Sequence, residues 1–415
     1  MGEVFRRPAF RALFIGQAIS GFGDWMVTVA LMALVLRVSG SSTAVGGVLL
    51  LRLLPAAAAA PFAARGVRGW DRRRTMQAAD LVRAGIVVAI PLVAALWWVY
   101  VCAFLLEAAG IVFLPARDSL IPDLVERDQL SLANSAILVS SYGSIPFGAA
   151  AFGAVAALSP GGGWLGGHPF VLVFFLDAVT FVVSFLFVSR LPKSSEEASR
   201  PSDEPQARFR DALRIPLVRM VMTPTAAIVL ALGSLFSLGV VYVRDVLGAS
   251  DTQFGLMIAL FGVGAAIGLG ALQLARDHDH ITNIRHGVIV QGATVALMSL
   301  ANGIALAFVG AVAFGAATAF VLASGMSALQ SMLEGHERVL AFTAFHVVIR
   351  AGLSLSAIAA GVAGDVIGDV RVPVVGVLEP ARLVLLCAGA LVLVTAPMLR
   401  SPTTTEVAVA GLHPH

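Results

Sequence analysis

Six ionisable residues lie well inside long apolar stretches of the chain. They are Asp24, Arg52, Glu107, Asp177, His346 and Arg350. A charge at the centre of a lipid bilayer costs roughly 2.5–3.5 kcal/mol, so each such group requires a partner or a water-filled cavity. Carboxylates and imidazoles placed in this way can carry protons, and guanidinium groups can hold anions. These residues are therefore the first candidates for a functional site.

Asp24 lies on a polar face of the first apolar stretch. Gln17, Gly21, Asp24 and Thr28 follow one another at i, i+4, i+7 and i+11, which places them on one side of a helix. We expect this face to line a central cavity, with Gln17 and Asp24 as cavity residues. Asp24 then serves as a substrate or proton site, or forms a structural pair with Arg52 on the next helix. The two interpretations are compatible.

Glu107 lies in the middle of another apolar stretch, between Leu106 and Ala108. Removal from water disfavours the charged form of a carboxylate, so this group is expected to bind a proton at neutral pH. A carboxylate that gains and loses a proton as its access to water switches is what proton-coupled antiport requires. The alternative is a neutral acid that makes a hydrogen bond to a neighbouring helix.

A second polar stripe runs along the eleventh apolar stretch. Thr343, His346, Arg350 and Ser354 are spaced at i, i+3, i+7 and i+11. Histidine titrates near physiological pH, which makes His346 a proton-coupling candidate. Arg350 is permanently charged and is a candidate for holding an anionic group or a carboxylate. The alternative is a ladder of hydrogen bonds between helices.

The composition explains where these residues lie. The chain has 415 residues, of which 58% are hydrophobic and 13% are charged, about half of the roughly 25% charged residues in soluble domains. The mean hydropathy is +0.89. Disordered chains and water-soluble domains are excluded, and a multi-pass membrane protein remains. The net charge of +3 comes with arginines in short loops, which favours a topology signal over nucleic-acid binding.

The chain contains twelve apolar stretches long enough to span a bilayer, which needs about 20 residues per helix. Their predicted bounds are 10–37, 43–64, 75–95, 97–116, 131–158, 169–190, 220–243, 253–275, 285–304, 306–330, 339–364 and 381–399. The division of 285–330 is placed at Asn302-Gly303. Arginines concentrate in every second loop, which predicts that both termini are cytoplasmic.

A polar segment at 193–215 separates six predicted spans from six. It indicates an N-terminal bundle at 1–192, a cytoplasmic linker, and a C-terminal bundle with a short tail at 216–415. The halves are alike: VLRVSGSSTAVGGVLL at 35–50 corresponds to VRDVLGASDTQFGLMI at 243–258. The offset is 207 to 209 residues (Arg37 to Arg244, Gly46 to Gly255). We expect a parallel repeat with a glycine turn and a Ser/Thr helix cap in each half.

Two six-helix halves with a basic loop between helices 2 and 3 resemble the major facilitator superfamily. LPARDSLIPDLV at 114–125 with LSLAN at 130–134, AADLVRA at 78–84 and VYVRDVLG at 241–248 look like the drug-efflux branch that contains macrolide and enterobactin exporters. FLDAVT at 175–180 resembles a family phrase of helix 6, and we favour a structural pairing role for Asp177. The resemblance implies an all-α fold of twelve transmembrane helices in two six-helix bundles.

The family's loop between helices 2 and 3 carries a glycine, an acidic residue four positions later, and then a basic cluster. Here the glycine position is Ala64 and the acidic position is Arg68, so the acidic partner is missing or is displaced to Asp71 or Asp80. The predicted gating residues are Asp71, Arg72, Arg73, Arg74, Asp80 and Arg83. Asp80 and Arg83 are three residues apart and either pair locally or serve the gate.

The resemblance implies a proton-coupled secondary transporter in the bacterial inner membrane, exporting a small amphipathic molecule by alternating access. Its partners are the substrate, protons and the bilayer, without nucleic acid, and the superfamily implies a monomer. No phosphate-loop motif, metal-ligand pattern or enzyme constellation is found in the sequence, so no cofactor or metal is expected. A siderophore or lysophospholipid as cargo remains open, as does a membrane sensor or scaffold that moves no substrate.

Overall fold

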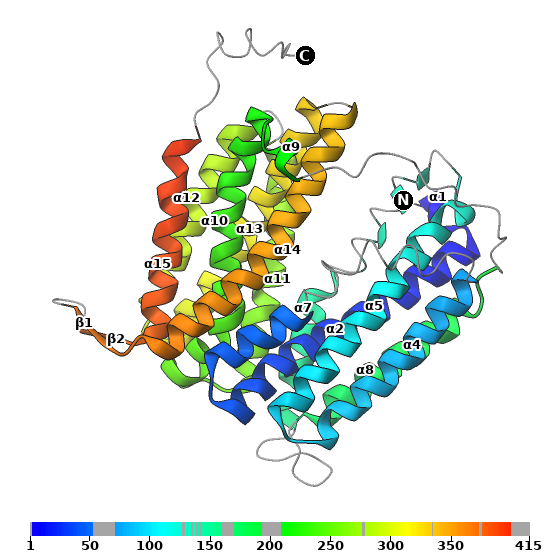
Figure 1. Ribbon diagram of the computed structural model, residues 1–415, viewed down its shortest axis with the longest axis horizontal. Coiled ribbons are helices and arrows are strands. Elements are labelled where there is room, and N and C mark those ends of the chain that lie inside the picture. The colour runs from blue at the N-terminus through cyan, green and yellow to red at the C-terminus, as the bar shows by residue number, and fades with distance from the viewer. Residues whose placement is uncertain are drawn as a thin grey trace. The chain divides into compact units, whose positions relative to one another are not determined.

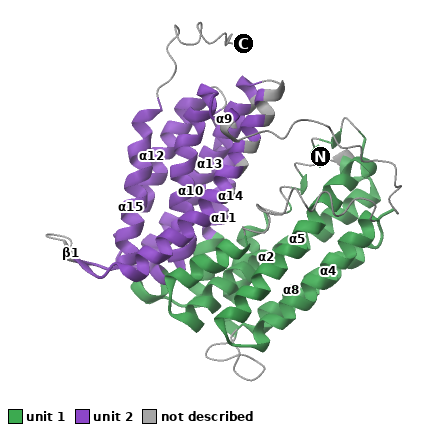
Figure 2. Ribbon diagram, in the orientation of Figure 1, with its two compact units in different colours: residues 1–203, 243–259 green, residues 204–242, 260–415 purple. Residues whose placement is uncertain are grey.

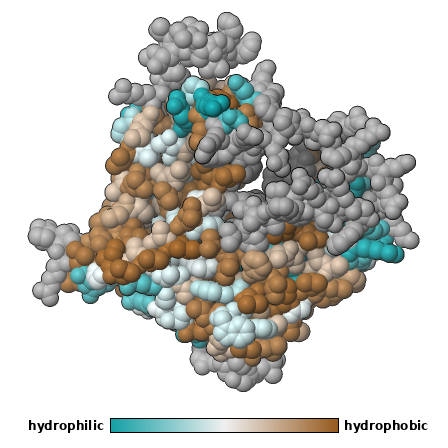
Figure 3. Space-filling model, in the orientation of Figure 1, coloured by the Kyte–Doolittle hydropathy of each residue, from teal (hydrophilic) through white to brown (hydrophobic). Residues whose placement is uncertain are grey.

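A computed structural model is built mainly of long helices (Figure 1). The structure describes residues 2–52, 71–126, 129–130, 132–133, 136–137, 140, 143–158, 170–192, 209–275, 279–333, 335–372 and 376–399. Nine helices in this described part are long and apolar enough to cross a membrane. Hydrophobic residues cover much of the described surface in Figure 3, as expected for helices that face lipid.

The helices follow the predicted apolar stretches closely. The N-terminal part contains α1 (Gly2–Phe5), α2 (Pro8–Ser39), a helix at Ser42–Arg52, α4 (Arg72–Ala89), the 3₁₀ turn η1 (Ile90–Leu92), α5 (Leu96–Leu124), α7 (Ile145–Leu158) and α8 (Val171–Val188). The C-terminal part contains α9 (Phe209–Ala212), α10 (Pro216–Val241), a π turn η3 (Tyr242–Val246), α11 (Asp251–Leu274), α12 (His280–Ser299), α13 (Ile304–Met332), α14 (Gly335–Val366), α15 (Pro380–Thr395) and the 3₁₀ turn η4 (Ala396–Met398).

The chain divides into two compact units, coloured green and purple in Figure 2. The first comprises Met1–Asp203 and Val243–Ala259, and the second comprises Glu204–Tyr242 and Leu260–His415. Residues 193–208 of the predicted linker lie outside the described residues, as do Ala64 and Arg68.

Helix α2 is central to the first unit, where it packs against α7 and α8, while α4 packs against α5 and α8. Gly23 allows the close approach of α2 to α8. A Cβ atom at this position would lie 2.0 Å from Asp177 Oδ1 and 2.3 Å from Thr180 Oγ1. Glycine therefore brings the α2 backbone directly against two polar side chains of α8.

The predicted turn is confirmed in both halves. Gly40 after α2 and Gly248 before α11 both have φ of 64°, the left-handed region that suits glycine. Ser41 then accepts a hydrogen bond from Ala44 N at 3.1 Å, and Ser250 accepts one from Gln253 N at 3.3 Å. These hydroxyls satisfy amide groups that the first turn of a helix leaves unpaired.

In the second unit, α10 packs against α14, and α12 packs against α13 and α15. Arg382 at the start of α15 is buried and donates to two carbonyl oxygens where α12 ends, to Ser299 O at 3.0 Å and Ala301 O at 2.7 Å. It also forms an ion pair with Glu379 at 2.7 Å. One guanidinium therefore satisfies carbonyls that the end of α12 leaves unpaired.

The structure confirms one predicted boundary and differs from the sequence prediction at two places. The break at Asn302-Gly303 is confirmed, since α12 ends at Ser299 and α13 begins at Ile304. The prediction of a loop directly after residue 116 is wrong, because α5 continues through Pro115 and Pro122 to Leu124. Arg72 of α4 stabilises this end of α5 through hydrogen bonds to Ser119 O and Asp123. A two-stranded antiparallel hairpin, β1 (Val370–Val372) and β2 (Gly376–Leu378), was not predicted.

We expect Arg382→Met to lower the melting temperature in detergent by several degrees. The change leaves two carbonyl oxygens without a charged donor, and hydrogen bonds to charged groups contribute about 1.5–3 kcal/mol. The matched control is Arg285→Met, because Arg285 is exposed on α12. Equal melting temperatures for the two variants would contradict this role of Arg382.

Candidate functional site

Five charged side chains gather inside the first unit. Four helices supply them: Asp24 from α2, Arg52 from the helix after it, Asp80 and Arg83 from α4, and Asp177 from α8. Electrostatic interactions connect Asp24 with Arg52, Arg83 and Asp177. We call these five residues the buried charge cluster.

Arg52 connects two polar residues of α2. Its guanidinium lies 4.0 Å from Asp24 Oδ1 and donates to Thr28 Oγ1 at 2.5 Å. The sequence prediction that Arg52 pairs with Asp24 is therefore supported by the geometry. The Asp24 side chain is 31% exposed and that of Arg52 is 14% exposed. This part of the cluster is therefore accessible to water.

Arg83 is held on all sides by groups of the first unit. It forms an ion pair with Asp80 one helical turn earlier, and its guanidinium carbon lies 4.5 Å from the Phe113 ring centre and 4.4 Å from that of Phe181. Cation–π contacts of this kind compensate for lost hydration. Asp80 is fully buried beside Ser184. The local pairing of Asp80 with Arg83, one of the two interpretations offered by the sequence, is confirmed, and both residues belong to the buried charge cluster.

Asp177, like Asp80, is a carboxylate of the cluster with no exposed surface. Thr180 Oγ1 donates to its Oδ1 at 3.0 Å, and Oδ2 is buried without a hydrogen-bond partner. Its electrostatic neighbours include Asp24, Arg52 and Arg83. The sequence favoured a structural pairing role for Asp177 without indicating its neighbours. The spacing of Asp177, Thr180 and Ser184 at i, i+3 and i+7 was the signal of a polar face directed into the bundle.

The remaining candidates occupy several places. Gln17 is buried and accepts a hydrogen bond from Arg117 of α5 at 3.2 Å. Glu107 is half-buried on α5. His346 and Arg350 lie on α14, and their side chains fall outside the described residues. Within the described residues, no group of three His, Cys, Asp or Glu side chains is arranged to hold a metal ion.

The basic segment at the start of α4 fastens neighbouring helices. Asp71 caps α4 by accepting from Arg74 N at 2.8 Å. Arg72 forms an ion pair with Asp123 at 2.7 Å, and Arg73 donates to Leu191 O at 2.9 Å. The carboxylate that meets this basic segment across helices is therefore Asp123, a residue that sequence analysis did not select.

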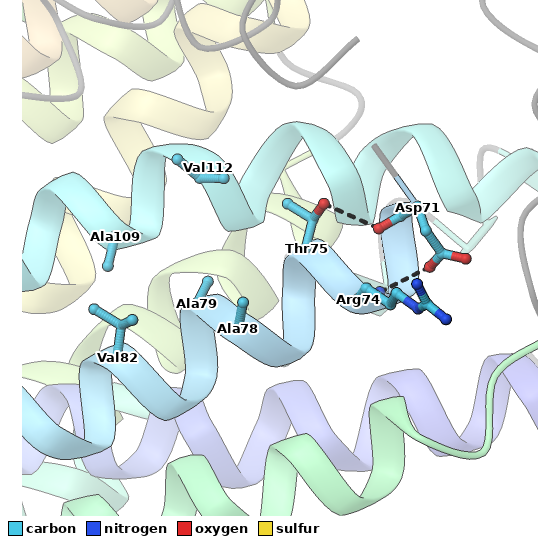
Figure 4. A pocket seen from close by; sticks show the side chains of 8 residues that line it. All are labelled: Asp71, Arg74, Thr75, Ala78, Ala79, Val82, Ala109 and Val112. Carbon is cyan, nitrogen blue, oxygen red and sulfur yellow. Dashed lines mark hydrogen bonds between the residues drawn. The ribbon is translucent and has the colours of Figure 1, made fainter. Parts of the chain in front are cut away.

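A groove of about 590 Å³ lies between α4 and α5 (Figure 4). Its walls are small apolar side chains, and Asp71 and Arg74 stand at one end (Figure 4). The lining residues are Asp71, Arg74, Thr75, Ala78, Ala79, Val82, Ala109 and Val112. This combination suits an apolar chain that carries a polar end.

A second charged group lies where α11 begins. Arg37 of α2 donates a hydrogen bond to Asp251 Oδ2 at 2.6 Å, and Arg244 forms an ion pair with Asp251 at 2.9 Å. Arg37 and Arg244 are the two arginines that the internal repeat makes equivalent. We call these three residues the Asp251 triad, in which a single carboxylate compensates two cations.

The sequence matches the family pattern described as Major Facilitator Superfamily over residues 13–285. The match covers well over half of the chain, so the chain belongs to this family of membrane transporters. The family assignment agrees with the long apolar helices of both units.

The most similar relatives fit this class. The chain is 24% identical over 383 residues to the uncharacterized MFS-type transporter YvqJ of Bacillus subtilis (strain 168), covering 88% of each protein. Among solved structures, a bacterial homologue of the human lysosomal transporter Spinster has a TM-score of 0.74 at 15% identity, covering 96% of this chain and 99% of that one. The nucleoside transporter NupG has a TM-score of 0.75 at 10% identity, covering 94% and 98%. These structural likenesses define the fold.

We expect Asp80→Asn and Arg83→Met to interact strongly in a double-mutant cycle. Either change alone leaves one buried charge without its partner and should cost about 3–5 kcal/mol. The double variant removes both charges and should be less destabilised than the sum of the single variants. Unfolding in mixed micelles measures the three free energies, and additive effects would argue against the pairing.

We expect Asp251→Asn to lower thermal stability by about 1 kcal/mol at low salt, since it leaves two arginines without their shared anion. Asp245→Asn is the matched control, because Asp245 is exposed in the same segment. Added salt should narrow the difference by screening the repulsion between the arginines. If the two variants melt alike at low salt, the triad contributes nothing to stability.

Proposed function

We propose that this chain is a proton-coupled secondary transporter that exports a small amphipathic molecule by alternating access. The observation that carries the proposal is the buried charge cluster, in which a partly accessible carboxylate, Asp24, lies beside the fully buried Asp177. Ionisable groups inside membrane helices are expensive and characteristically mark ion pathways. In this proposal Asp24 and Glu107 handle protons, and Arg52 compensates the charge.

The direction of transport is proposed as outward, on the resemblance of residues 114–125 and 241–248 to drug exporters. The protein would act as a monomer in the bacterial inner membrane with both termini in the cytoplasm. The basic segment Arg72–Arg74 would then form part of the inner gate. His346 and Arg350 on α14 are proposed to complete the substrate cavity from the second bundle.

The groove between α4 and α5 favours a second candidate, a lysophospholipid transporter. Its apolar walls fit one acyl chain, and the opposite charges of Asp71 and Arg74 suit a zwitterionic headgroup. Siderophore transport and a sensor or scaffold without flux are the further alternatives. Proteoliposomes loaded with a macrolide or with lysophosphatidylcholine, under an imposed pH gradient, distinguish these possibilities. Absence of flux and of proton counterflow with every probe would favour the sensor.

We expect Glu107→Gln and Asp24→Asn each to reduce pH-gradient-driven flux at least tenfold, because amides cannot exchange a proton. Exchange of labelled for unlabelled substrate across the same membranes needs no net proton movement and should persist. Asp118→Asn is the control, since Asp118 is exposed on α5 outside the cluster. Unchanged driven flux in one variant would remove that carboxylate from the coupling mechanism.

A further inference from the structure

The buried charge cluster does not balance. Asp24, Asp80 and Asp177 supply three carboxylates, while Arg52 and Arg83 supply two guanidinium groups. Helix α7 next to α2 has no ionisable residue in its sequence, and neither has η1 beside α8. If all five groups of the cluster were ionised, its net charge would be −1. Binding one proton makes the cluster neutral.

Both guanidinium groups are committed to carboxylates other than Asp177. Arg83 forms its ion pair with Asp80 between the rings of Phe113 and Phe181. Arg52 lies against Asp24 and donates to Thr28. Among the ion pairs of the described residues, none includes Asp177. The carboxylate without a direct counter-charge is therefore fully buried, whereas the equally buried Asp80 has Arg83 beside it.

The surroundings of Asp177 favour a neutral acid. Only Thr180 donates to it among the described contacts, and one oxygen is buried without a partner. An unpaired neutral hydroxyl in an apolar setting costs a few kcal/mol, whereas an isolated ionised carboxylate costs far more. At Gly23 the α2 backbone lies directly against Asp177, since even a Cβ atom there would lie 2.0 Å from Asp177 Oδ1.

We propose that Asp177 is the resident proton carrier of the cluster and that Asp24 relays this proton to and from water. Asp24 directly follows Gly23, the residue that contacts Asp177, and its side chain is 31% exposed. In the transfer, the O–H bond on Asp177 breaks and one forms on Asp24, leaving Asp177 ionised and Asp24 neutral. Asp24 then releases the proton to water.

The transfer changes which pairs are favourable. A neutral Asp24 releases Arg52, whose 4.0 Å contact is the loosest ion pair of the cluster. The newly ionised Asp177 then attracts the guanidinium, because opposite charges interact strongly at low dielectric. While the proton is on Asp24, Arg52 would thus shift from α2 toward α8. Release of the proton to water ionises Asp24 again and leaves Arg52 between two carboxylates. The role in coupling rests on the proposed function, but the site of the proton does not.

Infrared spectroscopy of the purified protein tests the assignment at neutral pH. Aspartate labelled with ¹³C at the side-chain carboxyl separates its C=O stretch from that of Glu107. We expect a protonated-aspartate band in the wild type that is absent from Asp177→Asn and retained in Asp118→Asn, whose aspartate is exposed on α5 outside the cluster. A band that persists in Asp177→Asn, or an absent band in the wild type, would overturn the proposal.

Thermal stability supplies a second, independent measurement. Asn resembles the neutral acid, so Asp177→Asn should melt within a few degrees of the wild type. Asp80→Asn should melt clearly lower, because it strands the Arg83 cation. A large loss of stability in Asp177→Asn alone would show that the ionised form is the native one and would overturn the assignment. Neither measurement needs a substrate, so a failure of transport with a positive band result would count against the proposed function only.

Discussion

The cost of placing charge away from water governs the first unit of this protein. Each buried cation there is compensated by a specific group: Arg83 by Asp80 and two aromatic rings, and Arg52 by Asp24 and Thr28. Such pairs contribute little net stability, but breaking one is expensive. Arg52 therefore fixes which face of α2 meets the helix at Ser42–Arg52. The contact of Arg83 with Phe181 does the same for α4 and α8.

Charge compensation also governs the glycine turns that follow the first helix of each sequence repeat. Gly40 and Gly248 adopt the same left-handed conformation, and the arginines that precede them, Arg37 and Arg244, reach one carboxylate, Asp251. A duplicated sequence would place two cations in equivalent positions without an anion for either. Asp251 has no repeat counterpart of its own kind, since the equivalent segment of the first half carries Ser and Thr. Because only the second repeat carries this aspartate, one carboxylate lies between the two arginines and offsets their mutual repulsion.

Sequence patterns predicted what depends on one helix at a time. Long apolar runs predicted the helices, and Asn302-Gly303 predicted the boundary between α12 and α13. Glycine followed by serine predicted both turns. Contacts between helices were harder. Asp80 and Asp177 lie 97 positions apart (177 − 80), and no local pattern shows that they enter one cluster. The extension of α5 was missed because prolines normally end helices, and the hairpin was missed because Val370–Leu378 is too short for a periodic signal.

An exclusively structural role for Asp177 is difficult to reconcile with its chemistry. A side chain needed only to accept a hydrogen bond from Thr180 could be Asn, which offers the same oxygen without the risk of a buried charge. Aspartate differs from asparagine in one respect at this position, since it can lose a proton. That ability has a cost when two neighbouring arginines already have their carboxylates. It becomes useful only if the cluster changes its charge, and a partly exposed Asp24 beside the α2–α8 contact supplies the path by which it can do so.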